Sequence, residues 1–336
     1  MSAVSAVVLV ASGDVPPPLT PSRIISAWTV DPWLGTIVVL IGGLYFYGVS
    51  VLKRRGDKWP GGRTIAFVGG GLGTMCIATM SCLGTYDETL ISVHMIQHMV
   101  LSMVVPVFLA LGAPVTLALR TLPLAWRTRL VALLHSRVAK FLTFPLVTGI
   151  LFVATPFVLY FSGWYEATLR NDYLHEATHL HFVLIGCLWF WPLLGIDPIP
   201  GRIAHPFRML AIFVTLPFHA ILGLTIMQSS DVIAANWYDS LGRTWGSSPL
   251  ADQHAAGGIL WGSGDLVGFM VFAVLGVQWA KASKKEAERE DRRLDRIEAY
   301  EARQARAAAD AADAQSTQDA QDAQDADTVT ETPARA

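Results

Sequence analysis

Two pairs of histidines occur at helical spacing. His94 and His98 are four residues apart, and His175 and His179 repeat that spacing. Residues four apart project from one face of a helix, so each pair can present both imidazole rings to the same ligand. Imidazole suits zinc, copper and haem iron. Both pairs are therefore candidate metal ligands.

Sulfur donors close to these histidines narrow the choice of metal. Met95 and Met99 adjoin the first pair. Imidazole combined with thioether suits copper, Cu(I) above all. Two further histidines extend the set: His181, which would point to a different face of a regular helix than His179, and His219, deep in another apolar stretch. We expect a site for transiently bound Cu(I) formed by His94, His98, His175, His179, His181, His219, Met95 and Met99.

Acidic and amide side chains could support these ligands. A carboxylate often orients a metal-bound histidine through the second ring nitrogen. Four candidates for such a supporting role open the last apolar stretch or lie within it: Asp252, Gln253, His254 and Asp265. Asp87 and Glu88, just before the first histidine pair, could gather cations.

The same residues allow other chemistry. Residues 175–179 read His-Glu-Ala-Thr-His, and in zinc proteases such a motif binds zinc while its glutamate acts as the general base. No obvious third ligand follows, so an HExxH membrane metalloprotease is the lesser alternative. The main alternative is a haem-binding membrane cytochrome, with His98 and either His179 or His219 as axial ligands. A scaffold whose histidines only pack is a third.

The composition indicates a membrane protein. Of the 336 residues, 52% are hydrophobic and 15% are charged, whereas a soluble domain carries roughly 25% charged residues. Seven apolar stretches approach the roughly 20 residues that a membrane-spanning helix needs, and the third should break near Gly112–Pro114. We predict an all-α domain over 33–280 with seven transmembrane helices near 33–52, 64–83, 93–119, 140–162, 179–195, 208–228 and 255–279. Gly69 and Gly73, four apart in the second stretch, predict close helix packing.

Basic residues predict the orientation. They crowd every other loop, for example Lys53–Arg55, Arg127–Arg129 and Arg202–Arg208, and Lys281 follows the last stretch. Loops rich in lysine and arginine remain in the cytoplasm. The N-terminus is therefore expected outside and the C-terminus in the cytoplasm, with the paired histidines on the external side.

The two ends of the chain are expected to lie outside the apolar, membrane-spanning domain. Residues 1–32 are expected to form an external segment, in which AVVLVA is a weak signal-peptide candidate. Residues 281–336 form a charged cytoplasmic tail, predicted to be helical over 281–306 and disordered over 307–336. The net charge of −2 predicts no nucleic-acid partner.

Four blocks of the sequence carry a family resemblance. Their letters are HMIQHMVLSMVVPVFLALGAPVTLALR (94–120), HEATHLHFVLIGCLWFWPLLGIDPIPGR (175–202), RMLAIFVTLPFHAILG (208–223) and DQHAAGGILW (252–261). In order and spacing they resemble the CtaG-type cytochrome c oxidase assembly factors, especially the actinobacterial branch, over roughly residues 33–280. The recurring histidines of that family fall on the six candidate histidines, and its Asp-Gln element falls on Asp252 and Gln253.

The resemblance implies a multi-pass protein of the bacterial plasma membrane that is needed to assemble an active haem–copper oxidase. The implied role is to supply or handle copper for the oxidase on the outer face, without a catalysed reaction. The implied partners are subunits of the oxidase. Some relatives carry a fused copper-transport domain that this sequence does not show, so a copper importer or chaperone is expected as a separate partner.

Overall fold

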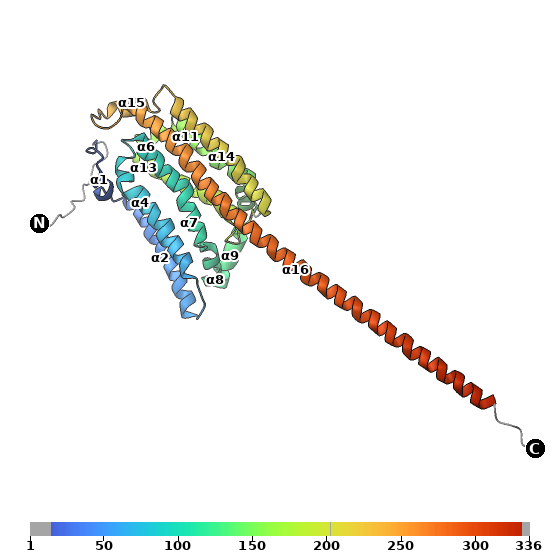
Figure 1. The fold of residues 1–336 in the computed structure, drawn as a ribbon. Coiled ribbons are helices and arrows are strands. Elements are labelled where there is room, and N and C mark those ends of the chain that lie inside the picture. Colours follow the sequence, from blue (N-terminus) through green and yellow to red (C-terminus); the bar gives the residue numbers. More distant parts are fainter. Residues whose placement is uncertain (1–14, 202, 331–336) are drawn as a thin grey trace, which may run out of the picture. The chain divides into compact units, whose positions relative to one another are not determined.

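The structure is a computed structural model that describes residues 15–201 and 203–330, and side chains as far as residue 321. Within these ranges the chain is helical and contains no strand (Figure 1). The residues up to Gly276 form one compact unit, and those from Val277 form a second. The AVVLVA run and Arg202 lie outside the described residues.

The helices of the first unit follow the apolar stretches. In chain order the described elements are α1 (Pro21–Ser26), α2 (Pro32–Arg54), α3 (Gly61–Thr64), η1 (Ile65–Gly73), α4 (Thr74–Met80), α5 (Cys82–Tyr86), α6 (Ile91–Met99), η2 (Val100–Val104), α7 (Val105–Leu111), α8 (Pro114–Thr121), α9 (Leu124–Leu134), α10 (Arg137–Leu142), α11 (Pro145–Phe161), α12 (Trp164–Leu169), α13 (Asp172–Leu194), α14 (His205–Gln228), α15 (Ala235–Ser240) and α16 (Pro249–Thr330). The segments η1 and η2 are π-helical.

Six helical segments of the described chain, two of them interrupted, are long and apolar enough to cross a membrane. They are Pro32–Arg54, Gly61–Tyr86, Ile91–Thr121, Asp172–Leu194, His205–Gln228 and the start of α16. The predicted fourth span, 140–162, is shorter than expected, because Pro145 begins α11 and the extended backbone of Ser162 ends it after 17 residues. The all-α prediction is confirmed, and the number of long apolar helices among the described residues is six.

The predicted break in the third span is confirmed. Helix α7 ends at Leu111, Ala113 has a positive φ of 50°, and Pro114 starts α8. The Tyr45 hydroxyl donates a hydrogen bond to the Gly112 carbonyl oxygen over 2.9 Å. The break thus frees a backbone carbonyl, which the neighbouring helix α2 satisfies.

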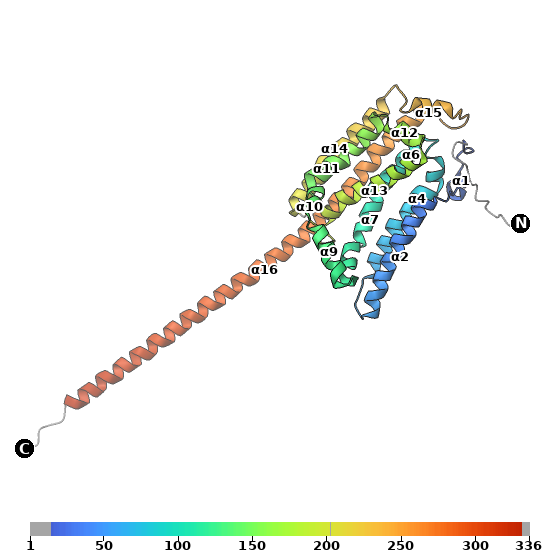
Figure 2. The same cartoon turned by 180° about the vertical axis from the view of Figure 1, so that it is seen from behind.

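Glycines let two pairs of segments approach closely, although not at the predicted positions. A Cβ atom at Gly70 would lie 2.4 Å from the Phe108 ring, and one at Gly71 would lie 2.6 Å from the Leu109 side chain, whereas Gly69 has nothing within 4 Å. At Gly186 of α13, a Cβ would lie 2.1 Å from the Ser102 carbonyl oxygen of η2. This second contact brings α13 against the α6–η2 segment (Figures 1 and 2).

Helix α16 begins in the first unit, and its continuation forms the second. From Val277 the described chain is a single helix up to Thr330. Where the sequence predicts disorder from residue 307 onward, the described backbone is therefore helical as far as Thr330.

Candidate metal centre

The two predicted histidine pairs meet and form a closed ring of four imidazoles. His94 and His98 come from α6, and His175 and His179 come from α13. Around the ring, the centroid distances are 3.8 Å from His94 to His98, 5.9 Å to His179, 4.5 Å to His175 and 5.5 Å back to His94. All four side chains are buried, with at most 4% of their surface exposed. We call them the four-histidine cluster.

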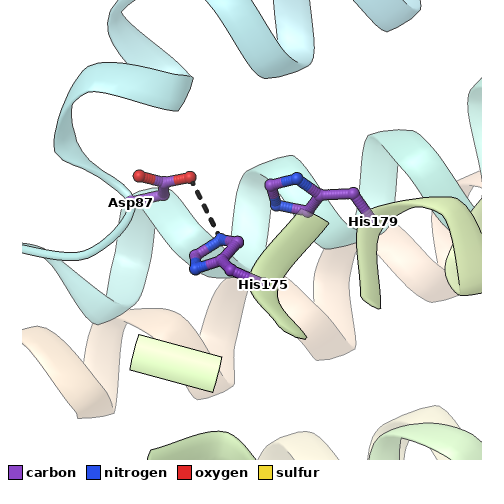
Figure 3. Close-up of side chains that lie close together, drawn as sticks. All are labelled: Asp87, His175 and His179. Atoms are coloured by element: carbon purple, nitrogen blue, oxygen red, sulfur yellow. Dashed lines mark ion pairs between the residues drawn. The ribbon is translucent and has the colours of Figure 1, made fainter. Parts of the chain in front are cut away.

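Asp87 anchors one corner of the cluster (Figure 3). It follows α5, and one of its carboxylate oxygens lies 3.4 Å from Nε2 of His175. The other ring nitrogen, Nδ1, lies 3.6 Å from the Glu88 carboxylate. Potential ligand atoms of Asp87, His175 and His179 lie within 4.8 Å of one another. The three could hold an ion directly, or Asp87 could orient His175 through Nε2 and leave Nδ1 free to bind it.

Gln97 fixes the orientation of His179. The Gln97 amide nitrogen donates to the Ala78 carbonyl oxygen (3.1 Å) and to Asp87 (2.8 Å), which leaves its oxygen as an acceptor. That oxygen lies 2.9 Å from Nε2 of His179, so the ring donates through Nε2. A neutral imidazole carries a single N–H. Neutral His179 therefore presents the lone pair of Nδ1.

Tyr160 plays a comparable part for His98. Its hydroxyl oxygen lies 3.3 Å from Nδ1 of His98, and it donates to the sulfur of Met95 over 3.5 Å. When the hydroxyl donates to the sulfur, its oxygen accepts from Nδ1–H of His98. The lone pair of neutral His98 then lies on Nε2.

Unpaired ring nitrogens are the chemical signature of this site. Each of the four histidines has at least one buried ring nitrogen without a hydrogen-bond partner among the described residues. His94 has two. Buried polar atoms are normally hydrogen-bonded, and leaving one unpaired costs about 1–3 kcal/mol. A metal ion would use the same lone pairs, so the donor set fits a metal centre better than a packing role.

Carboxylates surround the same end of the bundle. Burial and the negative charge of Asp87 raise the pKa of Glu88 to about 7. Burial and the neighbouring Glu176 raise the pKa of Asp31 to about 6. For Asp87, burial acts to raise the pKa, but the hydrogen bond and charge of His175 together outweigh it and lower the value. These groups would attract a cation to the cluster.

Comparison with known proteins shows the family to which the chain belongs. Residues 43–282 match the family described as cytochrome c oxidase caa3 assembly factor. The chain belongs to this family. It is 39% identical over 281 residues to an uncharacterized protein of Mycobacterium bovis and to one of Mycobacterium tuberculosis, and 36% identical to one of Mycobacterium leprae. Each alignment covers 82% of this chain and 42% of the relative, so the chain spans less than half the length of these proteins. No solved structure matches.

The structure separates the remaining predicted ligands from the cluster. His181 is half-buried, and its Nε2 lies 3.3 Å from the Thr155 hydroxyl. It lies outside the ring because two residues turn a helix by roughly 200°. His219 of α14 is buried beside Phe152, with a ring distance of 5.5 Å. Together with His98, Met95 and Met99, it lines a small cavity next to the cluster.

Three of the four predicted supporting residues, Asp252, Gln253 and His254, form hydrogen bonds that hold helices and loops. Asp252 accepts hydrogen bonds from the backbone and hydroxyl of Ser92 at the start of α6. Gln253 accepts from the Ile233 backbone N–H over 2.6 Å and donates to the Asp231 carbonyl oxygen over 2.9 Å. His254 is exposed, with Nε2 3.1 Å from the Ser229 carbonyl oxygen. Asp265 has a buried oxygen without a partner among the described residues. Their hydrogen bonds thus reach the backbone and Ser92 rather than the cluster.

Sequence reasoning missed Gln97, Tyr160 and Asp31. Gln97 and Tyr160 contact histidines that are 82 and 62 residues away in the chain. A signal was available for Gln97 alone, because it lies between the two histidines of α6 and is a polar residue in an apolar helix. Tyr160 gives no such signal among the aromatic residues of its span.

Proposed function

We propose that this assembly factor binds copper at the four-histidine cluster and supplies it to subunits of a haem–copper oxidase during assembly. The observation that carries the proposal is the closed ring of four buried imidazoles with unpaired nitrogens. Copper is the cargo, and no catalysed reaction is proposed. Two methionines beside the ring favour Cu(I) over zinc, because thioether sulfur is a soft ligand.

The proposal includes a seven-span topology in the bacterial plasma membrane. Helix α11, with 17 residues, would be the fourth span in chain order and would bring the total to seven. At 1.5 Å per residue it is about 26 Å long, slightly short of the roughly 30 Å hydrocarbon core. The basic loops support an external N-terminus and a cytoplasmic C-terminus. The four-histidine cluster then lies toward the external side, where a separate importer or chaperone would deliver copper.

The surrounding residues suit a site that loads and unloads. Asp87, Gln97 and Tyr160 each contact one ring nitrogen of a cluster histidine and fix the direction in which the other points. Such supporting contacts raise metal affinity by orienting the ligands before binding. Asp31 and Glu88 are half-buried carboxyl groups at the same end of the bundle. Their pKa values of about 6 and about 7 lie close to neutral pH, which limits the repulsion of Asp31 by Glu176 and of Glu88 by Asp87.

The dimensions of the site argue against haem. Ring centroids in the cluster are 3.8–5.9 Å apart, and the adjoining cavity has a volume of about 20 Å³. A cavity of that size holds about one water molecule, whereas pockets for molecules the size of cofactors measure roughly 300–1,000 Å³. A macrocycle between His98 and His179 or His219 would require the helices to separate.

A copper titration tests the proposal. The purified protein in detergent would be titrated anaerobically with Cu(I) against a chromophoric chelator, and an absorption spectrum would be recorded. We expect stoichiometric copper, no Soret band, and loss of cluster copper in His94→Ala/His98→Ala. His135→Ala, which changes a histidine far from the cluster in the chain, is the matched control. A wild-type protein that binds no copper under these conditions overturns the proposal, and a Soret band favours the cytochrome.

A further inference from the structure

A small cavity lies beside the four-histidine cluster and has its own set of donors. Its volume is about 20 Å³, enough for a single water molecule or ion. Two thioethers and two imidazoles line it: Met95, Met99, His98 and His219. We call it the thioether cavity. Most of its remaining lining is apolar, from residues such as Phe152, Ile185 and Leu260.

These donors are withdrawn from solvent. Met95 and His98 are 1% and 3% exposed, and Met99 and His219 are each 7% exposed. The apolar surroundings make the cavity a poor place for a doubly charged ion, because burying charge without compensation is costly. A singly charged ion with soft ligands meets a smaller penalty, and thioether with imidazole is a donor set that Cu(I) accepts.

His98 belongs to both places. Its ring centroid lies 3.8 Å from that of His94 within the cluster, and the ring also lines the thioether cavity. Its Nε2 is buried without a partner among the described residues. The Tyr160 hydroxyl contacts both His98 and the Met95 sulfur, so it joins the two sites. An ion held at the cluster could therefore exchange its ligands one at a time, from imidazoles to thioethers, while staying bound to His98.

His219 completes the set from another helix. Its Nδ1 lies 3.4 Å from the Thr215 carbonyl oxygen one turn earlier in α14, which places the N–H on Nδ1. The lone pair of neutral His219 is then on Nε2. Gly264 of α16 packs against this ring, since a Cβ there would lie 3.0 Å from it. The ring is thus packed against both Phe152 and α16.

We infer that the thioether cavity is a second Cu(I) site, which receives the ion from the four-histidine cluster through His98. This inference rests on the proposed function, because it requires copper at the cluster. The ion keeps its oxidation state, so the transfer needs no reductant. The two sites have different roles. The four-histidine cluster collects the ion, and the thioethers of the cavity hold Cu(I) away from water.

The test counts copper ions and identifies their ligands. Wild type, Met95→Leu/Met99→Leu and His175→Ala/His179→Ala would be loaded with Cu(I), and their copper would be examined by X-ray absorption. Leucine for methionine nearly conserves volume, so the first variant should fold. Exposed Met270→Leu is the matched control. We expect two equivalents in wild type with sulfur ligands, one equivalent without sulfur in the methionine variant, and slower loading of the sulfur-bound copper in the histidine variant, because the cluster passes the ion to the cavity.

The outcomes separate the two proposals. Copper bound by nitrogen alone in wild type, with no loss in the methionine variant, overturns the second site and leaves the proposed function intact. No copper in wild type overturns both. Sulfur ligation that persists in Met95→Leu/Met99→Leu also overturns the inference, because the sulfur then comes from another residue.

Discussion

The side-chain oxygen of Gln97 lies 2.9 Å from Nε2 of His179, while its amide nitrogen donates to Asp87, the carboxylate beside His175. The Gln97 amide therefore contacts His179 directly and reaches His175 through Asp87. Its two ends cannot be exchanged without placing the amide oxygen against two acceptors, the Asp87 carboxylate and the Ala78 carbonyl oxygen, so Gln97 fixes the protonation pattern on this side of the cluster.

Replacing Gln97 by leucine should weaken copper binding while leaving all four histidines in place. The leucine side chain provides no acceptor for His179, so Nδ1 no longer has a fixed lone pair. Loss of such a supporting contact costs about 10- to 100-fold in metal affinity. Competition with a Cu(I) chelator measures this change. An affinity equal to that of wild type would show that Gln97 does not orient the ring.

Replacing Gly186 by alanine should destabilise the bundle. The added Cβ would lie 2.1 Å from the Ser102 carbonyl oxygen and 2.5 Å from Pro106. Backbone cannot move away cheaply, and overpacking costs roughly 1–3 kcal/mol. Thermal unfolding in detergent measures the loss. Gly258→Ala is the control, because no atom lies within 4 Å of the new methyl group, and an equal effect of both changes would refute the argument.

Replacing Glu176 by glutamine separates copper handling from proteolysis. The change keeps the side-chain size and removes only the charge that a zinc protease needs for its general base. We expect unchanged copper stoichiometry and unchanged oxidase activity in membranes of a complemented deletion strain. Loss of oxidase assembly with retained metal would instead support the protease.

Replacing Asp31 by asparagine should change how stability depends on pH. The pKa of Asp31 is about 6, against an ordinary value of 3.8. The folded protein thus binds this proton more tightly than the unfolded chain, and ionisation lowers stability as pH rises from about 4 to 6. Asparagine still caps α2 and avoids the charge facing Glu176. Asp31→Asn should therefore exceed wild type in melting temperature at pH 7, with a smaller difference at pH 4. Exposed Asp239→Asn should show no such trend.

Local patterns predict local features of this protein well. Apolar stretches predict the helices, Gly112–Pro114 predicts the break after α7, and four-residue spacing predicts that each histidine pair shares a face. Choices that depend on a distant neighbour are harder. The sequence favours Gly69 and Gly73 as packing glycines, but Phe108 and Leu109 approach Gly70 and Gly71 instead. Likewise, spacing cannot show that Asp252 reaches Ser92, 160 residues away.

In the four-histidine cluster, the ring distances within a helix are fixed, whereas the ring distances between α6 and α13 can change. Its 3.8 Å and 4.5 Å sides each belong to a single helix, so helical geometry fixes them. Its 5.5 Å and 5.9 Å sides run between α6 and α13. At the Gly186–Ser102 crossing the two segments are already in contact, so the helices can pivot there. A slight tilt of α13 about that point would change the width of the cluster but not its length, so a residue without a side chain sets the point about which the histidines move.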